Sequence, residues 1–279
     1  MIKKISKFKK YLRNPSFMIG LCVLILVLLT SVFAPYLAPN DPYETSIQNR
    51  FSSPCAEYPF GTDELGRCLL SRIMYGGATT LWLSFLSLAI ALVLGITLGL
   101  FAGYYKYLDA PIMRLIDIFM SFPSMLLAIV VVAILGSGTM NVTIAIGIGT
   151  MPAFARLVRG QVLSLKTAQY IDSARISGAG DLRIMFQHIL PNSISQIIVY
   201  ASSQMSWIII SVSTLSFLGL GVQPPTPEWG AIASGGKNYL RLAPCISLFP
   251  VIFIFVVVLA FNLMGDGLRD VLDNRDEEE

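Results

Sequence analysis

The side chains best able to do chemistry are concentrated in one polar stretch, residues 169–192. The chain on either side is almost uncharged, whereas this stretch carries Asp172, Arg175, Asp181, Arg183 and His188. His188 is the only histidine of the sequence, and no set of cysteines or carboxylates lies near it at the spacing of a metal site. We therefore expect no catalytic residue and no metal site. The charges beside apolar residues indicate a surface that docks against a partner.

The local pattern of this stretch predicts two short helices joined by a bend. Residues 170–177 have helical character, and Gly178-Ala179-Gly180 is typical of a helix end. Asp181 is placed to cap the second helix, because its carboxylate can accept backbone N–H groups. Pro191 is expected to end that helix, since it lacks an N–H donor. Helical spacing puts four apolar residues on one face: Leu182, Met185, Phe186 and Ile189.

The apolar face of the second helix needs a partner, and the residues alone leave two candidates. The helix could lie on the membrane surface, or it could dock on another protein. The choice depends on where the stretch lies within the whole chain.

The composition excludes an ordinary soluble domain. Of the 279 residues, 54% are hydrophobic and 13% are charged, against about 25% charged residues in typical soluble proteins. The formal charge of +3 is too small to indicate a nucleic-acid partner. We therefore expect an all-α polytopic membrane protein that contacts lipid.

Apolar runs predict six membrane-spanning helices. The uncharged run 118–155 has 38 residues, which is too long for one crossing of a core about 30 Å thick at about 1.5 Å per residue. The cluster Gly136-Ser137-Gly138-Thr139 supplies a turn that divides this run. The expected spans are residues 17–36, 78–104, 118–135, 141–158, 193–218 and 244–264.

The basic residues predict the orientation. If residue 1 is cytoplasmic, 15 of the 20 Lys and Arg residues fall on the inner side, as the positive-inside rule requires. Both termini and the loop 159–192 are then cytoplasmic.

In the outer loop 38–72, Cys55 and Cys68 could form a disulfide or remain free. The chain divides into an N-terminal arm with first span and outer loop (1–76), a five-helix domain (77–268) and an acidic cytoplasmic tail (269–279).

Two spans carry residues at a distinctive spacing. A GxxxGxxxG face, on which another helix can approach closely, is formed by Gly95, Gly99 and Gly103. Four residues of the fifth span could line a transport pathway or could serve helix–helix contact. They are Ser203, Trp207, Ser211 and Thr214.

The spacing within residues 172–191 resembles a motif of bacterial ABC-importer permeases. That motif reads Glu-Ala-Ala, three residues, Gly, nine residues, Ile, one residue, Leu-Pro. This chain has Asp172-Ser173-Ala174, three residues, Gly178, nine residues and His188-Ile189-Leu190-Pro191. Asp172 keeps the charge of the usual Glu, whereas Ser173 and His188 depart from the pattern. The resemblance implies a coupling helix that docks into a cleft of a separate ATPase subunit.

Further blocks narrow the resemblance to the second (C-type) subunit of the dipeptide/oligopeptide/nickel permease family. Cys68 stands where that family usually has Asp. The blocks imply a type I ABC importer permease with six helices. They are FGTDELGR at 60–67, AFARLVR at 153–159, SFLGLG at 216–221, PTPEWG at 225–230 and FNLMGDGLRD at 261–270.

The resemblance implies a permease subunit in a bacterial plasma membrane that forms half of a pathway for di- or oligopeptides. The implied partners are a homologous second permease, two ATPase subunits and an extracytoplasmic substrate-binding protein. Glutathione, nickel and metal chelates stay open as substrates, because the same family includes their importers. The residues that the resemblance assigns to ATPase coupling are Asp172, Ala174, Gly178, Asp181, Leu182, Met185, Phe186, Ile189 and Pro191.

The sequence itself offers no energy source. It contains no GxxxxGK[ST] segment, which would form a phosphate-binding P-loop. The interiors of the six predicted spans hold no Asp, Glu, Lys, Arg or His, which ion-driven carriers use at membrane depth. We therefore expect a chain that is not an enzyme and binds no cofactor, with ATP and Mg²⁺ held by partner subunits. A self-contained carrier or channel is the alternative from a different class.

Overall fold

The computed structural model describes residues 14–273, and this part of the chain is mostly helical. Apolar runs form helices because, in lipid, a helix pairs its backbone polar groups within one segment. Shorter helices accompany the long ones, among them α3 (Ala34–Leu37), η1 (Ile47–Asn49) and η3 (Lys237–Tyr239). Five helices are long and apolar enough to cross a membrane: α2 (Pro15–Val32), α4 (Leu69–Tyr104), α7 (Thr139–Leu165), α10 (Leu190–Phe217) and α12 (Cys245–Asp273).

The third predicted span, 118–135, is not one straight helix. Two helices, α5 (Lys106–Met120) and α6 (Ser124–Leu135), meet there at an angle of 90°. Pro123 separates them, and a proline disfavours the helical conformation of the residue before it. If this bent pair counts as one span, the total is the six that were predicted.

Other helix boundaries also differ from those predicted. The first span breaks after α2, because Pro35 lies in the first turn of α3 and cannot continue a helix. α4 begins at Leu69 rather than near residue 78, and α7 continues to Leu165 rather than 158. The predicted turn at residues 136–139 is confirmed, with Gly136 at φ +90° and Gly138 at φ +149°.

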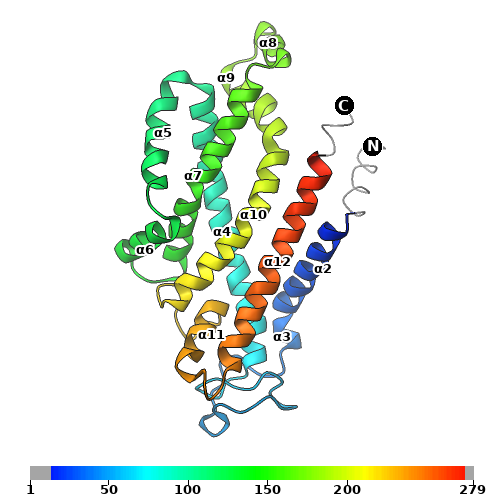
Figure 1. Ribbon diagram of the computed structural model, residues 1–279, viewed down its shortest axis with the longest axis vertical. Coiled ribbons are helices and arrows are strands. Elements are labelled where there is room, and N and C mark those ends of the chain that lie inside the picture. The colour runs from blue at the N-terminus through cyan, green and yellow to red at the C-terminus, as the bar shows by residue number, and fades with distance from the viewer. Residues whose placement is uncertain (1–13, 274–279) are drawn as a thin grey trace.

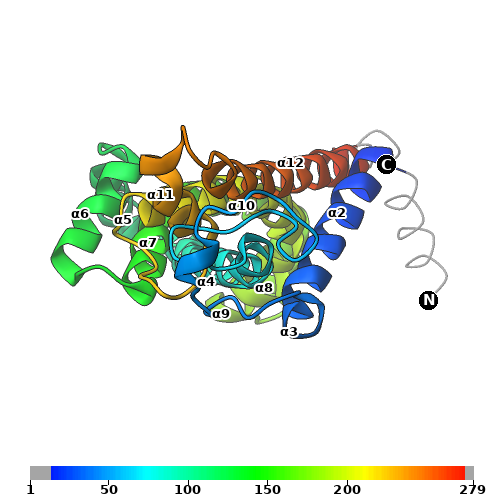
Figure 2. The ribbon, with the colours of Figure 1, turned by 90° about the horizontal axis from the view of Figure 1, so that it is seen from below.

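The long helices run side by side, so the loops gather at two ends (Figure 1). The start of α2 and the end of α12 lie at the same end as the stretch 169–192, which was predicted from the basic residues. Residues 38–68 lie at the opposite end. A second view shows α2 beside α12 at one edge and α6 at the opposite edge (Figure 2). The basic arm 1–13 and the tail residues 274–279 lie outside the described residues.

The predicted glycine face holds α4 against α7. A Cβ atom at position 99 would lie 2.6 Å from the Ala155 carbonyl oxygen and 2.7 Å from Val158 Cβ. Gly95 and Gly103 meet α7 in the same way, at Phe154 and Val162. Because the three glycines carry no side chain, α7 approaches the backbone of α4 closely along this face, and the two helices pack as one unit.

We expect Gly99→Ala to loosen this pair, since the added methyl group has no room. Overpacking of this kind costs about 1–3 kcal/mol of unfolding free energy, measurable as a lower thermal unfolding midpoint of the purified protein. Gly160→Ala is the matched control on α7, because a Cβ atom there has nothing within 4 Å. Equal midpoints for the two variants would contradict the close packing.

Candidate coupling site and pathway

The stretch 169–192, here called the coupling segment, begins with a short helix that ends at a glycine. α8 (Gln169–Ile176) is followed by Gly178 at φ +82°, as the sequence predicted. This left-handed conformation is easy only for glycine. A Cβ atom at position 178 would meet nothing within 4 Å, so backbone conformation rather than space requires the glycine.

The second helix of the coupling segment does not end at Pro191, so that prediction was wrong. α9 (Asp181–Arg183) continues through a π-helical turn, η2 (Ile184–Ile189), directly into α10. Pro191 lies in the first turn of α10. The π-helical turn already interrupts the regular α-helical hydrogen bonding, so a residue without an N–H donor is tolerated after it. The second helix of the coupling segment is therefore continuous with a membrane-spanning helix.

One side of the coupling segment packs against the transmembrane helices. Its side chains Ile171, Ile184 and Ile189 are fully buried. They join an apolar cluster with residues of α4, α7 and α10, namely Leu100, Val158, Val162 and Ile197. The segment is thus held by three helices at once.

The other side of the segment presents apolar side chains to the outside. Ile176 is 88% exposed, Leu182 60% and Phe186 50%. The predicted single face of Leu182, Met185, Phe186 and Ile189 was therefore wrong, because Met185 and Ile189 are buried. The π-helical turn holds more residues than an α-helical one, which shifts the faces relative to the 3.6-residue period.

The remaining predicted coupling residues lie around this outer surface. Asp172, Gly178 and Pro191 are exposed, and Ala174 is half-buried. The Asp172 Oδ1 atom lies 3.8 Å from the Arg175 Nη1 atom, and this ion pair is largely open to solvent.

Asp181 does not cap the second helix, so that prediction was also wrong. Gly180 occupies the N-cap position, and no side chain caps α9. The Asp181 carboxylate instead accepts a hydrogen bond from the Tyr104 hydroxyl at 2.7 Å. A carboxylate can satisfy a hydroxyl of another helix as readily as a backbone N–H. No pattern in the sequence indicated that Tyr104 would be this donor.

The four candidate pathway residues lie on α10 but do not share one surface. Ser203 and Trp207 are exposed, Thr214 is half-buried and Ser211 is buried. The hydroxyls donate within their own helix, Ser211 to the Trp207 carbonyl at 2.8 Å and Thr214 to the Ile210 carbonyl at 2.7 Å. Trp207 lines a cavity of about 260 Å³ between α10, α7 and the bend of α5 and α6, with Phe122, Thr150 and Gln204.

At the opposite end, a short helix follows the loop that contains Pro224, Pro225 and Pro227. α11 (Trp229–Gly236) is capped by Glu228, whose carboxylate accepts the Ala231 N–H at 2.8 Å. Glu228 is fully buried and also accepts a hydrogen bond from the Thr80 hydroxyl of α4 at 3.0 Å. The Trp229 indole donates to the Ile73 carbonyl at 2.9 Å. The block PTPEWG thus joins α11 to α4.

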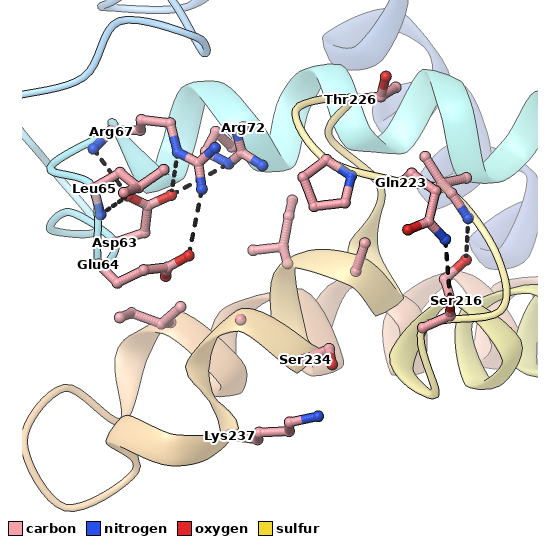
Figure 3. A pocket seen from close by; sticks show the side chains of 17 residues that line it. Asp63, Glu64, Leu65, Arg67, Arg72, Ser216, Gln223, Thr226, Ser234 and Lys237 are labelled. Atoms are coloured by element: carbon pink, nitrogen blue, oxygen red, sulfur yellow. Dashed lines mark hydrogen bonds and ion pairs between the residues drawn. The ribbon is translucent and has the colours of Figure 1, made fainter. Parts of the chain in front are cut away.

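The outer loop is joined to the same end of α4 by charged residues (Figure 3). Arg67 Nε lies 2.6 Å from Asp63 Oδ2 and Arg72 Nε 3.5 Å from it. Arg72 also donates to the Pro42 carbonyl at 3.0 Å. These residues line a cavity of about 280 Å³ that reaches Gln223. Cys55 and Cys68 are both free, and Cys68 is buried.

Residues 95–276 match the family described as the binding-protein-dependent transport system inner membrane component. The chain belongs to this family. Its N-terminal residues 7–54 match the N-terminal transmembrane domain of oligopeptide transport permease C. The family consists of transport permeases rather than enzymes.

Two relatives match nearly the whole permease. The dipeptide transport system permease protein of Alkalihalophilus pseudofirmus is 45% identical, over 95% of this chain and 88% of the relative. The glutathione transport system permease protein of Pectobacterium atrosepticum is 48% identical, over 91% and 85%. The inward-facing MetNI methionine ABC transporter has a similar fold, with a TM-score of 0.60, 19% identity, and coverage of 73% of this chain and 97% of that one.

We expect Glu228→Ala to destabilise the permease, because it leaves the Thr80 hydroxyl and the Ala231 N–H without a partner. An unsatisfied buried donor costs about 1–3 kcal/mol. Glu228→Gln is the matched control, since its amide oxygen can still accept the Ala231 N–H and its NH2 group can donate to the Thr80 hydroxyl, which can also accept. Thermal unfolding of the purified permease should give a lower midpoint for Glu228→Ala only, and a wild-type midpoint for this variant would contradict the contact.

The titration of Glu228 should also make the stability of the folded permease depend on pH. Burial raises the pKa of the Glu228 carboxyl group. The stability that Glu228 contributes is therefore complete below the pKa of its carboxyl group in the unfolded state. This stability is lost as the pH rises through the pKa in the folded state. Glu228→Gln, which stays neutral, should show a flatter dependence of the unfolding midpoint on pH than the wild type.

Proposed function

We propose that this permease is one membrane subunit of an ATP-driven importer of di- or oligopeptides, coupled to cytosolic ATPase subunits through the coupling segment. The observation that carries the proposal is the exposed apolar surface of that segment, formed by Ile176, Leu182 and Phe186. Exposed apolar patches rimmed by polar residues mark interaction sites. Asp172, Arg175 and Arg183 supply the polar rim here.

The orientation of the segment favours an ATPase over lipid as the partner. The basic residues put the segment in the cytoplasm, and the segment lies beyond the end of α4 and α7 (Figure 1). A helix that lies on a membrane surface needs a continuous apolar stripe. This segment buries Met185 and Ile189 within its own protein and shows outward side chains on both sides of a bend. A bend with apolar tips fits a cleft better than a flat surface.

A second permease is proposed because the candidate pathway is open on one side. Ser203 and Trp207 are exposed on α10, and Trp207 lines a cavity that is not closed. A pathway for a polar solute must be lined on all sides within the hydrocarbon region. A homologous subunit facing α10 would close it. An extracytoplasmic binding protein would deliver substrate at the end that holds α11.

The substrate proposal follows from the relatives. One relative transports dipeptides and another glutathione, which is itself a tripeptide. We therefore propose short peptides, with glutathione as a second candidate. ATP and Mg²⁺ would be held by the ATPase subunits, and the assembly would lie in a bacterial plasma membrane with both termini of this chain in the cytoplasm.

Replacing an outward apolar side chain should weaken ATPase docking. We expect Ile176→Asp to reduce the amount of ATPase that co-purifies with the permease, because a charge enters an apolar contact. Ile47→Asp is the matched control, since Ile47 is 82% exposed at the opposite end. Retention of ATPase by Ile176→Asp at the level of Ile47→Asp would refute the docking surface.

Changing the bend should uncouple transport from hydrolysis. Gly178→Val forces a β-branched residue into φ +82°, which it adopts only with strain. Uptake of a labelled dipeptide or of glutathione by vesicles should fall, while permease insertion stays normal. Asp172→Lys should act in the same direction. Normal uptake by both variants would contradict the role of the segment, and gradient-driven flux by the purified chain alone would favour a self-contained carrier.

A further inference from the structure

Three parts of the cytoplasmic end meet at one side chain, Tyr104, the last residue of α4. Its hydroxyl donates to Asp181 Oδ1 of α9 at 2.7 Å. The Arg175 guanidinium of α8 lies over its ring, 6.0 Å from the ring centroid. Arg175 is in turn 3.8 Å from Asp172. Both helices of the coupling segment, one on each side of Gly178, are therefore linked to the same aromatic ring.

Tyr104 belongs to a closely packed pair of helices. Its helix, α4, packs on α7 through Gly95, Gly99 and Gly103, which place no side chain of α4 between the two backbones. The Lys166 ammonium, at the end of α7, donates to the Gly103 carbonyl at 2.8 Å. A displacement of Tyr104 is thus a displacement of α4 and α7 together.

The polar contacts of Tyr104 differ in kind from the apolar attachment of the coupling segment. Ile171, Ile184 and Ile189 are fully buried and hold the segment to the helix ends through apolar contacts. The apolar effect is not directional, whereas a hydrogen bond and a cation–π contact have preferred geometries. Tyr104 therefore sets the angle of the bend relative to α4.

We propose that Tyr104 is a positioning residue that transmits movement of the coupling segment to the α4–α7 pair. This inference rests on the proposed function, because it requires an ATPase to move the segment. The Asp181 carboxylate is the acceptor of this link and Arg175 its second contact. α10 follows the segment by direct helical continuity, so the Tyr104 link adds α4 and α7 to the same motion.

Tyr104→Phe removes only the hydroxyl and tests this link in the assembled transporter. The expected result is normal co-purification of the ATPase with a fall of about fivefold or more in dipeptide taken up per ATP hydrolysed, the range of a coupling between two sites. Tyr107→Phe is the matched control, because Tyr107 is 72% exposed near the same end of α4. A wild-type ratio for Tyr104→Phe would overturn the proposal.

A double-mutant cycle separates a specific link from general damage. Asp181→Asn keeps an oxygen acceptor and should retain most of the coupling, whereas Asp181→Ala should resemble Tyr104→Phe. The double variant Tyr104→Phe/Asp181→Ala should be no worse than either single variant, since both remove the same interaction. Additive losses would overturn the proposal.

The neighbouring Tyr105 supplies a further control, since its ring lies edge-on to Tyr104, with centroids 5.1 Å apart. Tyr104→Phe/Tyr105→Phe should therefore couple no better than Tyr104→Phe. Loss of ATPase from Tyr104→Phe would make Tyr104 a docking residue and overturn the proposal. If instead Ile176→Asp keeps its ATPase, the proposed docking surface fails, whatever Tyr104 does.

Discussion

The close contact of α4 with α7 is the interaction on which the rest of this permease depends. Lipid tails are as apolar as the helix surfaces, so burial from water does not drive helices together within the bilayer. Association then requires dispersion contacts over a long, well-fitted surface, which the glycines at 95, 99 and 103 provide. The coupling segment at one end and α11 at the other are both fixed to this pair.

The length of α4 explains how it can organise both ends. Its 36 residues span about 54 Å at about 1.5 Å per residue, well beyond a hydrocarbon core of about 30 Å. The extra turns reach water on either side, where polar contacts have partners. Arg72 holds the outer loop at one end, and Tyr104 meets the coupling segment at the other. One helix thus connects the two surfaces at which partners are proposed.

Features that depend on local chemistry could be predicted from the sequence, and features that depend on tertiary partners could not. The apolar runs and the glycine face indicated the spans and the α4–α7 contact, and the conformation of Gly178 followed from its position after a helix. The bend at Pro123 was missed because the uncharged run 118–155 continues across it. Asp181 was assigned to a cap because Tyr104 lies 77 residues away in sequence. The π-helical turn has no sequence signature, so the faces that follow it were misplaced.

The buried carboxyl group of Glu228 has a consequence for the order in which the helices assemble during synthesis. Its hydroxyl partner, Thr80, lies on α4, and a second hydroxyl within 3.4 Å, that of Ser213, lies on α10. Both helices leave the ribosome before α11. An acidic side chain enters an apolar interior at a cost of about 2.5–3.5 kcal/mol when it has no partner. The two hydroxyl donors are therefore synthesised before the carboxyl group that accepts from them, and α11 closes over helices that precede it in the chain.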